Sequence, residues 1–281
     1  MLDAELAQPP WGTFRPSLPV RALIGLSRQT LLGRGLLRKQ LAQQFVRLHS
    51  GPVDTWLWGH KVRLFPQHNV SERKALLRPD RMDPREYAFV RTQLGRPGSV
   101  FVDVGANAGL YSLYAALNAG EGTRILAIEP DAGLLARLAF NLQLAAAAGA
   151  VVANVATAAV AAGDQDGEGL LSIGADEGSR SLRTDGAGRR VPVRRLDGLL
   201  QEYAISKVSL MKIDVEGYED RVLPPYLSEA SADRWPQSII IEHVYREAWS
   251  VDCIALCQKR GYAVSATTNN NTLLVRPSIN P

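Results

Sequence analysis

The sequence predicts an α/β protein built on a mostly parallel sheet with helices on both faces. From about residue 97 onward, short and almost continuously apolar segments alternate with helical segments. This pattern is typical of parallel strands that are buried on both faces. The last two strands are instead joined directly by an asparagine-rich turn, so they are expected to form a hairpin that places an antiparallel strand at the edge of the sheet.

Seven strands and the helices between them follow from the apolar pattern. The first two strands are each followed by a long helical segment, and a short helix with two cysteines precedes the terminal hairpin. The strands are expected at residues 100–105, 124–130, 151–160, 208–215, 238–244, 262–268 and 272–277, and the two long helices at 110–119 and 131–148.

The first 96 residues are expected to form an extension before a main domain at residues 97–281. Apolar residues recur at mixed spacings of three and four between residues 18 and 49, which indicates one or two amphipathic helices broken near Gly33 or Gly35. The segment DTWLWGHKVRLFP then alternates around a Gly-His turn, which predicts a small β-hairpin. The basic helices can pack on the main domain as a lid, or bind a membrane surface or a partner.

The distribution of charge argues against nucleic acid as a partner. The chain carries a formal net charge of +4, but residues 1–50 hold seven Lys or Arg and two Asp or Glu, a surplus of five. The remaining residues therefore sum to about −1, so the predicted catalytic body offers no excess of positive charge to phosphates.

Cysteine usage and the N-terminus indicate a cytoplasmic protein. Cys253 and Cys257 are the two cysteines, and their spacing of four places them on one face of a helix rather than in a disulfide framework. The start MLDAELAQPPW lacks the basic and apolar regions of a secretory signal. The uncharged run at residues 144–162 is interpreted as the end of a helix and a strand, so no transmembrane segment is expected.

A long connection between the third and fourth strands stands out by its composition. Residues 164–197 are rich in glycine, serine and charged residues, and they exceed the usual length of such a connection. They are expected to contain a short hairpin. The segment is either an insertion that faces the substrate or a surface excursion.

A glycine turn follows the first strand, where a parallel sheet binds its ligand. Asp103 ends the strand, Gly105 permits the tight turn, and Gly109 opens the next helix. Glu129 ends the second strand 24 residues after Gly105, a position from which a carboxylate accepts hydrogen bonds from both hydroxyls of a ribose. The turn therefore fits either a dinucleotide or the adenosine of S-adenosylmethionine.

Two residues of the turn favour a ligand without phosphate. Asn107 stands where a dinucleotide fingerprint has the glycine that lets the backbone approach a pyrophosphate. Asp103 would repel a pyrophosphate, whereas it can accept hydrogen bonds from the cationic group of an amino acid. Both observations point to S-adenosylmethionine.

The order D-V-G-A-N-A-G, I-E-P, V-R-R-L-D, K-I-D-V-E-G-Y-E and I-I-I-E-H resembles the FkbM family of S-adenosylmethionine-dependent methyltransferases over roughly residues 97–245. The resemblance implies the class I methyltransferase fold, which is Rossmann-like, with a seven-stranded, mostly parallel sheet and a C-terminal antiparallel hairpin. It implies methyl transfer from S-adenosyl-L-methionine, with S-adenosyl-L-homocysteine as product, to an oxygen of a small metabolite, sugar or natural product. The cofactor residues that it implies are Asp103, Gly105, Asn107 and Gly109 on the methionine and ribose side, Glu129 on the ribose, and Ala162 and Asp164 near the adenine.

The acceptor side is argued from the chemistry of methyl transfer, which needs an aligned nucleophile and removal of a proton from a hydroxyl. Asp214 and Glu216 follow the fourth strand, and Glu242 and His243 follow the fifth, so their side chains are expected at the same end of the sheet. His243 is the expected general base, with Asp214 or Glu216 orienting it or the substrate. His243 can equally be a strand-end histidine bound to a neighbour.

Three alternatives bear on this site. Asp214 and Glu216 could bind magnesium, but only Glu242 follows the fifth strand as a further ligand, so no metal is expected. Glu219 and Asp220 are interpreted as favourable charges at the start of a helix. The segment LPPY at residues 223–226 resembles an amino-methyltransferase motif, but Leu223 replaces its polar residue, and the two prolines are interpreted as a helix stop.

The function predicted is therefore O-methylation of a small-molecule or glycan hydroxyl, and a carboxylate acceptor stays open. The alternative is a non-catalytic methyltransferase-fold module that docks a partner through its basic N-terminal segment. A nicotinamide-dependent oxidoreductase is a third possibility. The acceptor and the oligomeric state do not follow from the sequence.

Overall fold

The structure is a computed structural model that describes residues 9–29, 35–172, 176–183 and 187–277. The chain divides into two compact units. Unit 1 comprises residues 1–84, 136–152 and 175–178, and unit 2 comprises residues 85–135, 153–174 and 179–281. The expected domain boundary at residue 97 stays a prediction.

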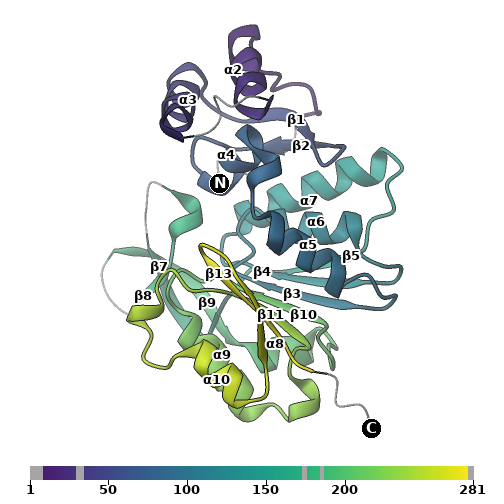
Figure 1. Cartoon of the computed structure of the whole chain (residues 1–281), viewed down its shortest axis with the longest axis vertical. Helices are drawn as coiled ribbons and strands as arrows, with labels where there is room; N and C mark the ends of the chain where they lie inside the picture. The colour runs from purple at the N-terminus through teal and green to yellow at the C-terminus, as the bar shows by residue number, and fades with distance from the viewer. Residues whose placement is uncertain (1–8, 30–34, 173–175, 184–186, 278–281) are drawn as a thin grey trace. The chain divides into compact units, whose positions relative to one another are not determined.

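Unit 2 contains the predicted sheet, and all seven expected strands are present. Their order is β12-β13-β11-β10-β3-β4-β5, with β3, β4, β5, β10 and β11 mutually parallel (Figure 1). The predicted α/β fold with a seven-stranded, mostly parallel sheet is confirmed. The strands are β3 Val100–Val104, β4 Arg124–Ile128, β5 Asn154–Ala158, β10 Leu210–Ile213, β11 Ser238–Glu242, β12 Ala263–Thr267 and β13 Asn271–Val275.

The predicted terminal hairpin is present at one edge of the sheet, and its strand β12 is the antiparallel edge strand. β13 pairs antiparallel with both β11 and β12, so it lies one position inside the sheet and β12 forms the edge. The burial of the two strands gives the reason, since β13 is almost wholly buried whereas β12 is mostly exposed. The more apolar strand of the hairpin takes the inner position.

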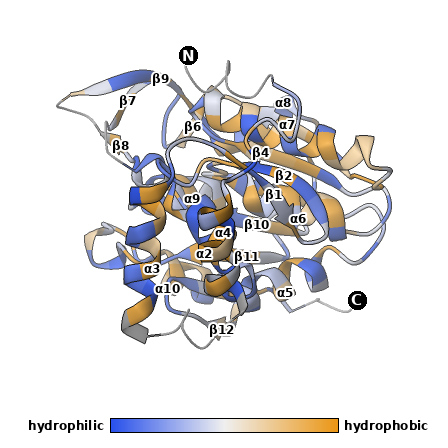
Figure 2. Cartoon of the chain, turned by 90° about the horizontal axis from the view of Figure 1, so that it is seen from above, coloured by the Kyte–Doolittle hydropathy of each residue, from blue (hydrophilic) through white to orange (hydrophobic). Residues whose placement is uncertain are grey.

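Helices cover both faces of this sheet, with α5 and α6 on one side and α8, α9 and α10 on the other (Figure 1). Alternate strand residues such as Val102, Val104, Met211 and Ile213 pack in the core with α8, α9 and α10. The central strands appear largely hydrophobic in Figure 2. The helices are α5 Pro84–Gln93, α6 Leu110–Asn118, α7 Ala132–Ala147, α8 Leu196–Glu202, α9 Glu219–Glu229 and α10 Cys253–Lys259, with 3-10 turns η4 Ala232–Arg234 and η5 Arg246–Ala248.

Helix α9 contradicts the expectation that Pro224 and Pro225 stop a helix. The helix runs from Glu219 to Glu229 with both prolines inside it. The buried face of α9 includes Leu223 and Tyr226, which pack in the main core of unit 2. This packing outweighs the backbone hydrogen bonds that the prolines remove, because most helical stability in a protein comes from the packed face.

The connection between β5 and β10 forms a second, four-stranded sheet with the order β6-β9-β7-β8. The expected hairpin is present as the consecutive antiparallel strands β7 and β8, and β7 also pairs antiparallel with β9. Each arginine of β9 forms an ion pair with a carboxylate: Arg189 with Asp131, Arg190 with Glu168, Arg194 with Asp166 and Glu202, and Arg195 with Glu229. The strands are β6 Ala161–Gly163, β7 Gly167–Ser172, β8 Leu182–Arg183 and β9 Gly188–Arg195.

Unit 1 contains the predicted helices and hairpin of the N-terminal segment. The helices α2 and α3 are separate, and α3 begins at Gly35, whereas Gly33 lies outside the described residues. The strands β1 and β2 pair antiparallel, as expected from the Gly-His turn. The elements are α2 Leu18–Gln29, α3 Gly35–Leu48, β1 Val53–Leu57, β2 His60–Leu64, α4 Val70–Leu77, η2 Pro79–Arg81 and η3 Glu177–Ser179, the last of which extends into unit 2.

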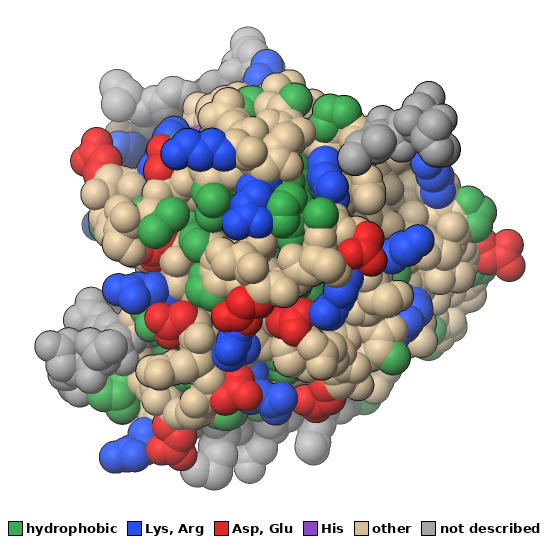
Figure 3. All heavy atoms as spheres, turned by 90° about the horizontal axis from the view of Figure 1, so that it is seen from below, with side chains coloured by type: hydrophobic (Ala, Val, Ile, Leu, Met, Phe, Trp, Pro, Cys, Tyr) green, Lys and Arg blue, Asp and Glu red, His purple; other side chains and the backbone are tan. Residues whose placement is uncertain are grey.

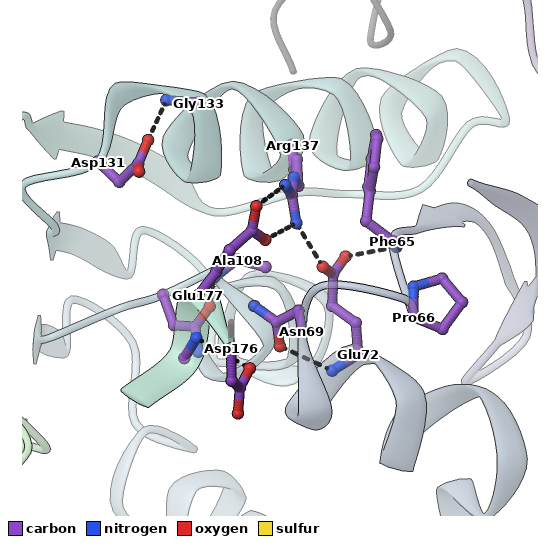
Figure 4. Close-up of polar contacts among 12 residues, drawn as sticks. Phe65, Pro66, Asn69, Glu72, Ala108, Asp131, Gly133, Arg137, Asp176 and Glu177 are labelled. Atoms are coloured by element: carbon purple, nitrogen blue, oxygen red, sulfur yellow. Dashed lines mark hydrogen bonds and ion pairs between the residues drawn. The ribbon is translucent and has the colours of Figure 1, made fainter. Parts of the chain in front are cut away.

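A buried ion network organises unit 1 around Arg137 of α7 (Figure 4). Arg137 Nη1 lies 2.8 Å from Glu72 Oε2 and 2.8 Å from Glu177 Oε2, and its guanidinium packs over the ring of Phe65. Glu72 also accepts a hydrogen bond from the Phe65 backbone N–H. The network therefore joins residues 175–178 to α4 and α7 within this unit.

Cys253 and Cys257 are both buried and free, on one short helix as expected. Among the helices of the described part of the chain, none has the length and apolar character needed to cross a membrane.

Candidate active site

The glycine turn between β3 and α6 adopts left-handed backbone conformations at three positions. The φ angles are +76° at Gly105, +53° at Asn107 and +74° at Gly109. Gly105 is also required by close packing, because a Cβ atom there would lie 1.8 Å from the backbone oxygen of Asp214. The turn after β3 is thus in direct contact with the end of β10, where the catalytic residues were expected.

Asn107 occupies its position because asparagine adopts the left-handed conformation more readily than other residues with a Cβ atom. Its side-chain oxygen accepts a hydrogen bond from the backbone N–H of Ala108, so the side chain stabilises its own turn. Its backbone N–H donates to Glu129 Oε2 at 2.9 Å. The glycine turn is therefore bound directly to the carboxylate expected to hold a ribose.

Glu129 binds two loops at once. Its other oxygen, Oε1, accepts from the backbone N–H of Asp131 at 2.9 Å, and the side chain is almost fully buried. Burial raises the pKa of Glu129 to about 7, although the two backbone N–H groups act to lower it. Since a carboxylate has about four sites for accepting hydrogen bonds, two remain for ligand hydroxyls.

Asp103 is completely buried at the end of β3. Its Oδ2 accepts from Ser112 Oγ at 2.7 Å, whereas Oδ1 has no hydrogen-bond partner within the described residues. Burial raises the pKa of this carboxyl, and the charge of Lys212 opposes that rise. The unpartnered oxygen fits the expectation that Asp103 accepts from a bound cationic group.

Ala162 and Asp164 follow β5 along the chain, as expected. Ala162 belongs to β6, in the four-stranded sheet, and its side chain is buried in the core of unit 2. Asp164 comes after β6 and forms a partly exposed ion pair with Arg221 at 3.5 Å. Their expected contact with an adenine stays a prediction.

Three carboxylates meet at the carboxyl ends of β10 and β11. One oxygen each from Asp214, Glu216 and Glu242 lies within 4.8 Å of the others. The parallel register explains this, because Ile213 pairs with Ile241 and the next residues are Asp214 and Glu242. Burial and then the charge of Asp214 raise the pKa of Glu216 to about 7 and that of Glu242 to about 9.

His243 is bound to a hydroxyl rather than to these carboxylates. Its Nδ1 lies 2.9 Å from Thr272 Oγ1 on β13, and its backbone N–H donates to the carbonyl of Asn270. The ring is therefore held by the terminal hairpin, and among the described residues it has no hydrogen bond with the carboxylate of Asp214 or Glu216. The role of His243 as general base stays a prediction.

Lys212 and Glu219 are site residues that the sequence reasoning missed. Lys212 Nζ donates to Asp214 Oδ2 at 2.7 Å. Glu219 accepts from the backbone N–H groups of Val215 and Gly217 and from Trp249 Nε1, so it holds the loop after β10 instead of only placing a charge at a helix start. The sequence K-I-D-V-E-G-Y-E did contain a signal for both residues. Lys212 lies two residues before Asp214, and Glu219 lies three residues after Glu216.

Asp220 likewise has a specific partner. Its Oδ2 accepts from both the backbone N–H and the hydroxyl of Ser250, in the segment after β11. Together with Glu219 and Trp249, this contact fixes the loops of β10 and β11 to each other. Glu219 and Asp220 therefore hold the loops at the carboxyl ends of β10 and β11, in addition to any interaction with the helix dipole.

The four-stranded sheet is attached to the loop that follows β4. Arg180 and Arg189 both contact Asp131 Oδ2, at 2.8 and 3.0 Å. Asp131 is two residues after Glu129 and donates its backbone N–H to it. The insertion therefore contacts the loop that carries the expected ribose-binding residue.

This arrangement, with a glycine turn, an acidic residue after the second strand and polar residues at the ends of the fourth and fifth strands, defines a Rossmann-like fold of the methyltransferase class. The model of the methyltransferase FkbM domain matches residues 103–262. The chain belongs to the FkbM methyltransferase family.

The individual proteins that the chain resembles share less than a third of its residues over the aligned regions. The chain is 29% identical over 227 residues to the AMB antimetabolite synthetase AmbE of Pseudomonas aeruginosa, covering 64% of this chain and 11% of that protein. The chain thus spans about a tenth of the length of this curated relative. A methyltransferase FkbM from Methylobacillus flagellatus aligns with 15% identity and a TM-score of 0.42, over 92% of this chain and 58% of the other. An O-methyltransferase from Bacillus cereus in complex with SAH aligns with 14% identity and a TM-score of 0.40, over 69% and 82%.

Proposed function

We propose that the protein transfers a methyl group from S-adenosyl-L-methionine to a hydroxyl of a small metabolite, sugar or natural product. The observation that carries this proposal is the contact between Gly105 and the backbone oxygen of Asp214. The turn that would hold the methyl donor therefore contacts the backbone of Asp214, one of the residues whose carboxylates would meet the acceptor. Membership of the FkbM family supports the same reaction class.

The residues around the turn fit this donor. Asp103 offers an unpartnered, buried oxygen to the ammonium group, and Glu129 retains capacity to accept from two ribose hydroxyls. When bound, the sulfonium supplies an activated methyl group. The protein then has to hold the acceptor oxygen in line with that group and accept its proton.

We assign the proton-accepting role to the carboxylate cluster, with His243 as the alternative. Glu216 is partly exposed, and its pKa of about 7 suits a general base at neutral pH. The phenol of Tyr245 acts to lower the pKa of Glu216, against burial and the charge of Asp214, which raise it. Glu242, whose pKa is about 9, holds a proton under the same conditions and can donate a hydrogen bond to the acceptor.

The charge of the cluster favours a neutral acceptor. Lys212 pairs with Asp214 and Glu242 holds a proton, so Glu216 carries the remaining negative charge of the cluster and would repel an anionic carboxylate acceptor. A hydroxyl of a small molecule or glycan meets no such cost. The relative AmbE is named as a synthetase of an antimetabolite, which supports the natural-product class.

Nucleic acid is not proposed as a partner. The arginines of β9 are all engaged with carboxylates, and acidic and basic side chains are interspersed on the face drawn in Figure 3. Such a surface lacks the continuous positive charge that phosphate binding uses. Action in the cytoplasm is part of the same proposal.

The first experiment compares thermal stabilisation by S-adenosylhomocysteine and by NAD, on protein freed of copurified ligand. Stabilisation by S-adenosylhomocysteine alone is the expected result, and its absence would refute the proposal. Transfer of a labelled methyl group to panels of glycans and secondary metabolites follows. Cofactor binding without turnover on any acceptor, together with capture of a partner that is lost when residues 18–48 are removed, would instead favour a docking module.

A further inference from the structure

Lys212 is a buried lysine at the centre of the candidate active site. Its side chain is 4% exposed, and it lies on β10 beside Asp103 of β3 in the parallel register. The ammonium group donates to Asp214 Oδ2 at 2.7 Å and lies 4.8 Å from the centre of the Tyr111 ring. A buried ammonium group persists only where carboxylates or aromatic faces compensate for lost hydration, and here both do.

The surroundings of Lys212 carry more negative than positive charge. Asp103 and Glu242 act on it electrostatically in addition to Asp214. Burial alone would lower the pKa of Lys212, but these carboxylates outweigh burial and raise it, so the group stays charged throughout the physiological range. A fixed positive charge is therefore built into the acidic end of the sheet.

A divalent cation is the common alternative for holding three carboxylates so close together. In this chain, Asp214 Oδ2 is already engaged by the Lys212 ammonium group. Asp214 is also the residue whose backbone oxygen packs against Gly105 of the glycine turn, and Tyr111 follows that turn in α6. The lysine thus contacts the acceptor side of the site and the helix that begins at the donor side.

We propose that Lys212 is a positioning residue whose ammonium group takes the place of a divalent cation among Asp214, Glu216 and Glu242 and holds Asp214 in its orientation toward the acceptor. The lysine acts through Asp214 and does not touch the acceptor itself. This inference deepens the proposed methyl transfer and rests on it for the meaning of the acceptor side. The pairing of Lys212 with Asp214 can be tested whether or not the protein transfers a methyl group.

The test uses Mn²⁺ as a probe, followed by the electron paramagnetic resonance signal of the free ion. The variants are Lys212→Met, which removes the charge, and Lys212→Arg, which retains it. Wild-type protein and Lys212→Arg are expected to bind Mn²⁺ at least tenfold more weakly than Lys212→Met. Adding Asp214→Asn to Lys212→Met should abolish the gained binding, because it removes the released carboxylate.

Two results would overturn the proposal: wild-type protein that binds Mn²⁺ as tightly as Lys212→Met, or a folded Lys212→Met that gains no affinity. Circular dichroism and stabilisation by S-adenosylhomocysteine report whether each variant is folded. If Lys212→Met does not fold, the ¹⁵Nζ signal of Lys212 in the wild-type protein decides instead. The signal should be protected from solvent exchange and should lose that protection in Asp214→Asn, and an unchanged signal would refute the pairing.

The same measurements separate this proposal from the proposed function. A wild-type protein that is not stabilised by S-adenosylhomocysteine contradicts methyl transfer but leaves the Mn²⁺ comparison intact. Once an acceptor is known, Lys212→Met should lower kcat with little change in the affinity for S-adenosylhomocysteine, and Lys212→Arg should restore part of the rate. A purely structural role would lower both together.

Discussion

The backbone N–H of Asn107 donates to Glu129 Oε2 across 2.9 Å, which joins the loops that follow the first two strands of the parallel sheet. Because Asp131 donates to the other oxygen of the same carboxylate, Glu129 fixes both loops before any ligand is bound. A site organised in this way loses less conformational freedom on binding.

Substitutions of Asn107 distinguish the contribution of its left-handed backbone to stability from that of its side-chain hydrogen bond. Asn107→Gly should fold with near wild-type stability, because glycine adopts a φ of +53° without strain. Asn107→Ala should lower the free energy of unfolding by about 1 kcal/mol, since an L-residue with Cβ is strained in this region. Urea denaturation measures both, with the exposed Asn118→Ala as control, and equal stability of the two variants would contradict the explanation.

Glu129→Gln should weaken binding of S-adenosylhomocysteine at least tenfold while the fold is retained. The amide keeps one accepting oxygen but turns an NH₂ group toward a backbone N–H donor, so the two loops are no longer both bound. Isothermal titration calorimetry gives the affinity. Glu168→Gln is the matched control and should leave the affinity unchanged, because Glu168 is bound to Arg190 at the surface.

Glu219→Ala should destabilise the loop after β10. The variant leaves the N–H groups of Val215 and Gly217 and the indole of Trp249 without their acceptor, at about 1–3 kcal/mol for each donor that stays buried. Glu219→Gln retains an accepting oxygen and should recover part of the loss. Hydrogen exchange at residues 214–217 and urea denaturation measure the effect, and a silent Glu219→Ala would show that the loop is held by other contacts.

The buried ion network of unit 1 should dominate the response to arginine substitution. Arg137→Ala leaves the buried carboxylates of Glu72 and Glu177 uncompensated and should lower the free energy of unfolding by about 3–5 kcal/mol. Arg190→Ala breaks an exposed pair with Glu168 and should cost less than about 1 kcal/mol. Chemical denaturation compares the two directly, and similar losses would be inconsistent with the network shown in Figure 4.

The raised pKa of Glu242 predicts a loss of stability at alkaline pH. The folded protein retains this proton up to about pH 9, whereas the group titrates near 4.5 when unfolded. The stability that the proton contributes is therefore complete below 4.5 and is lost as the pH rises toward 9. Between pH 7.5 and 9.5, Glu242→Gln should lose less stability than the wild type. The two buried cysteines act in both proteins, so their contribution cancels in the difference.

The fold could be predicted because each strand and helix is indicated by the pattern of residues within its own short segment. Apolar runs of strand length, separated by helical periodicity and ended by glycine or asparagine, predict a parallel sheet with a terminal hairpin. The donor side of the site was accessible for the same reason, since Gly105, Asn107 and Glu129 lie directly after strands. The acidic residues Asp214, Glu216 and Glu242 were also found by this rule, because parallel strands end at one edge.

The prediction that Pro224 and Pro225 stop a helix was wrong because packing outweighs local preference, and packing also decides features that the sequence left open. Pro224 and Pro225 stay inside α9 because the buried face of that helix stabilises it, and β13 takes the inner position of the hairpin because it is the more apolar strand. Ala162 belongs to a second sheet, and the short segment around it contains no pattern that predicts a strand there. None of these outcomes can be read from neighbouring residues alone.

The sequence by itself determined the order of the strands along the chain and the residues at their carboxyl ends. Only the tertiary structure decided which of those residues pair: Lys212 with Asp214, His243 with Thr272, and Glu129 with the backbone of Asn107. The physical reason is that charge and hydrogen-bond partners depend on strand register and burial, which join segments distant in the sequence.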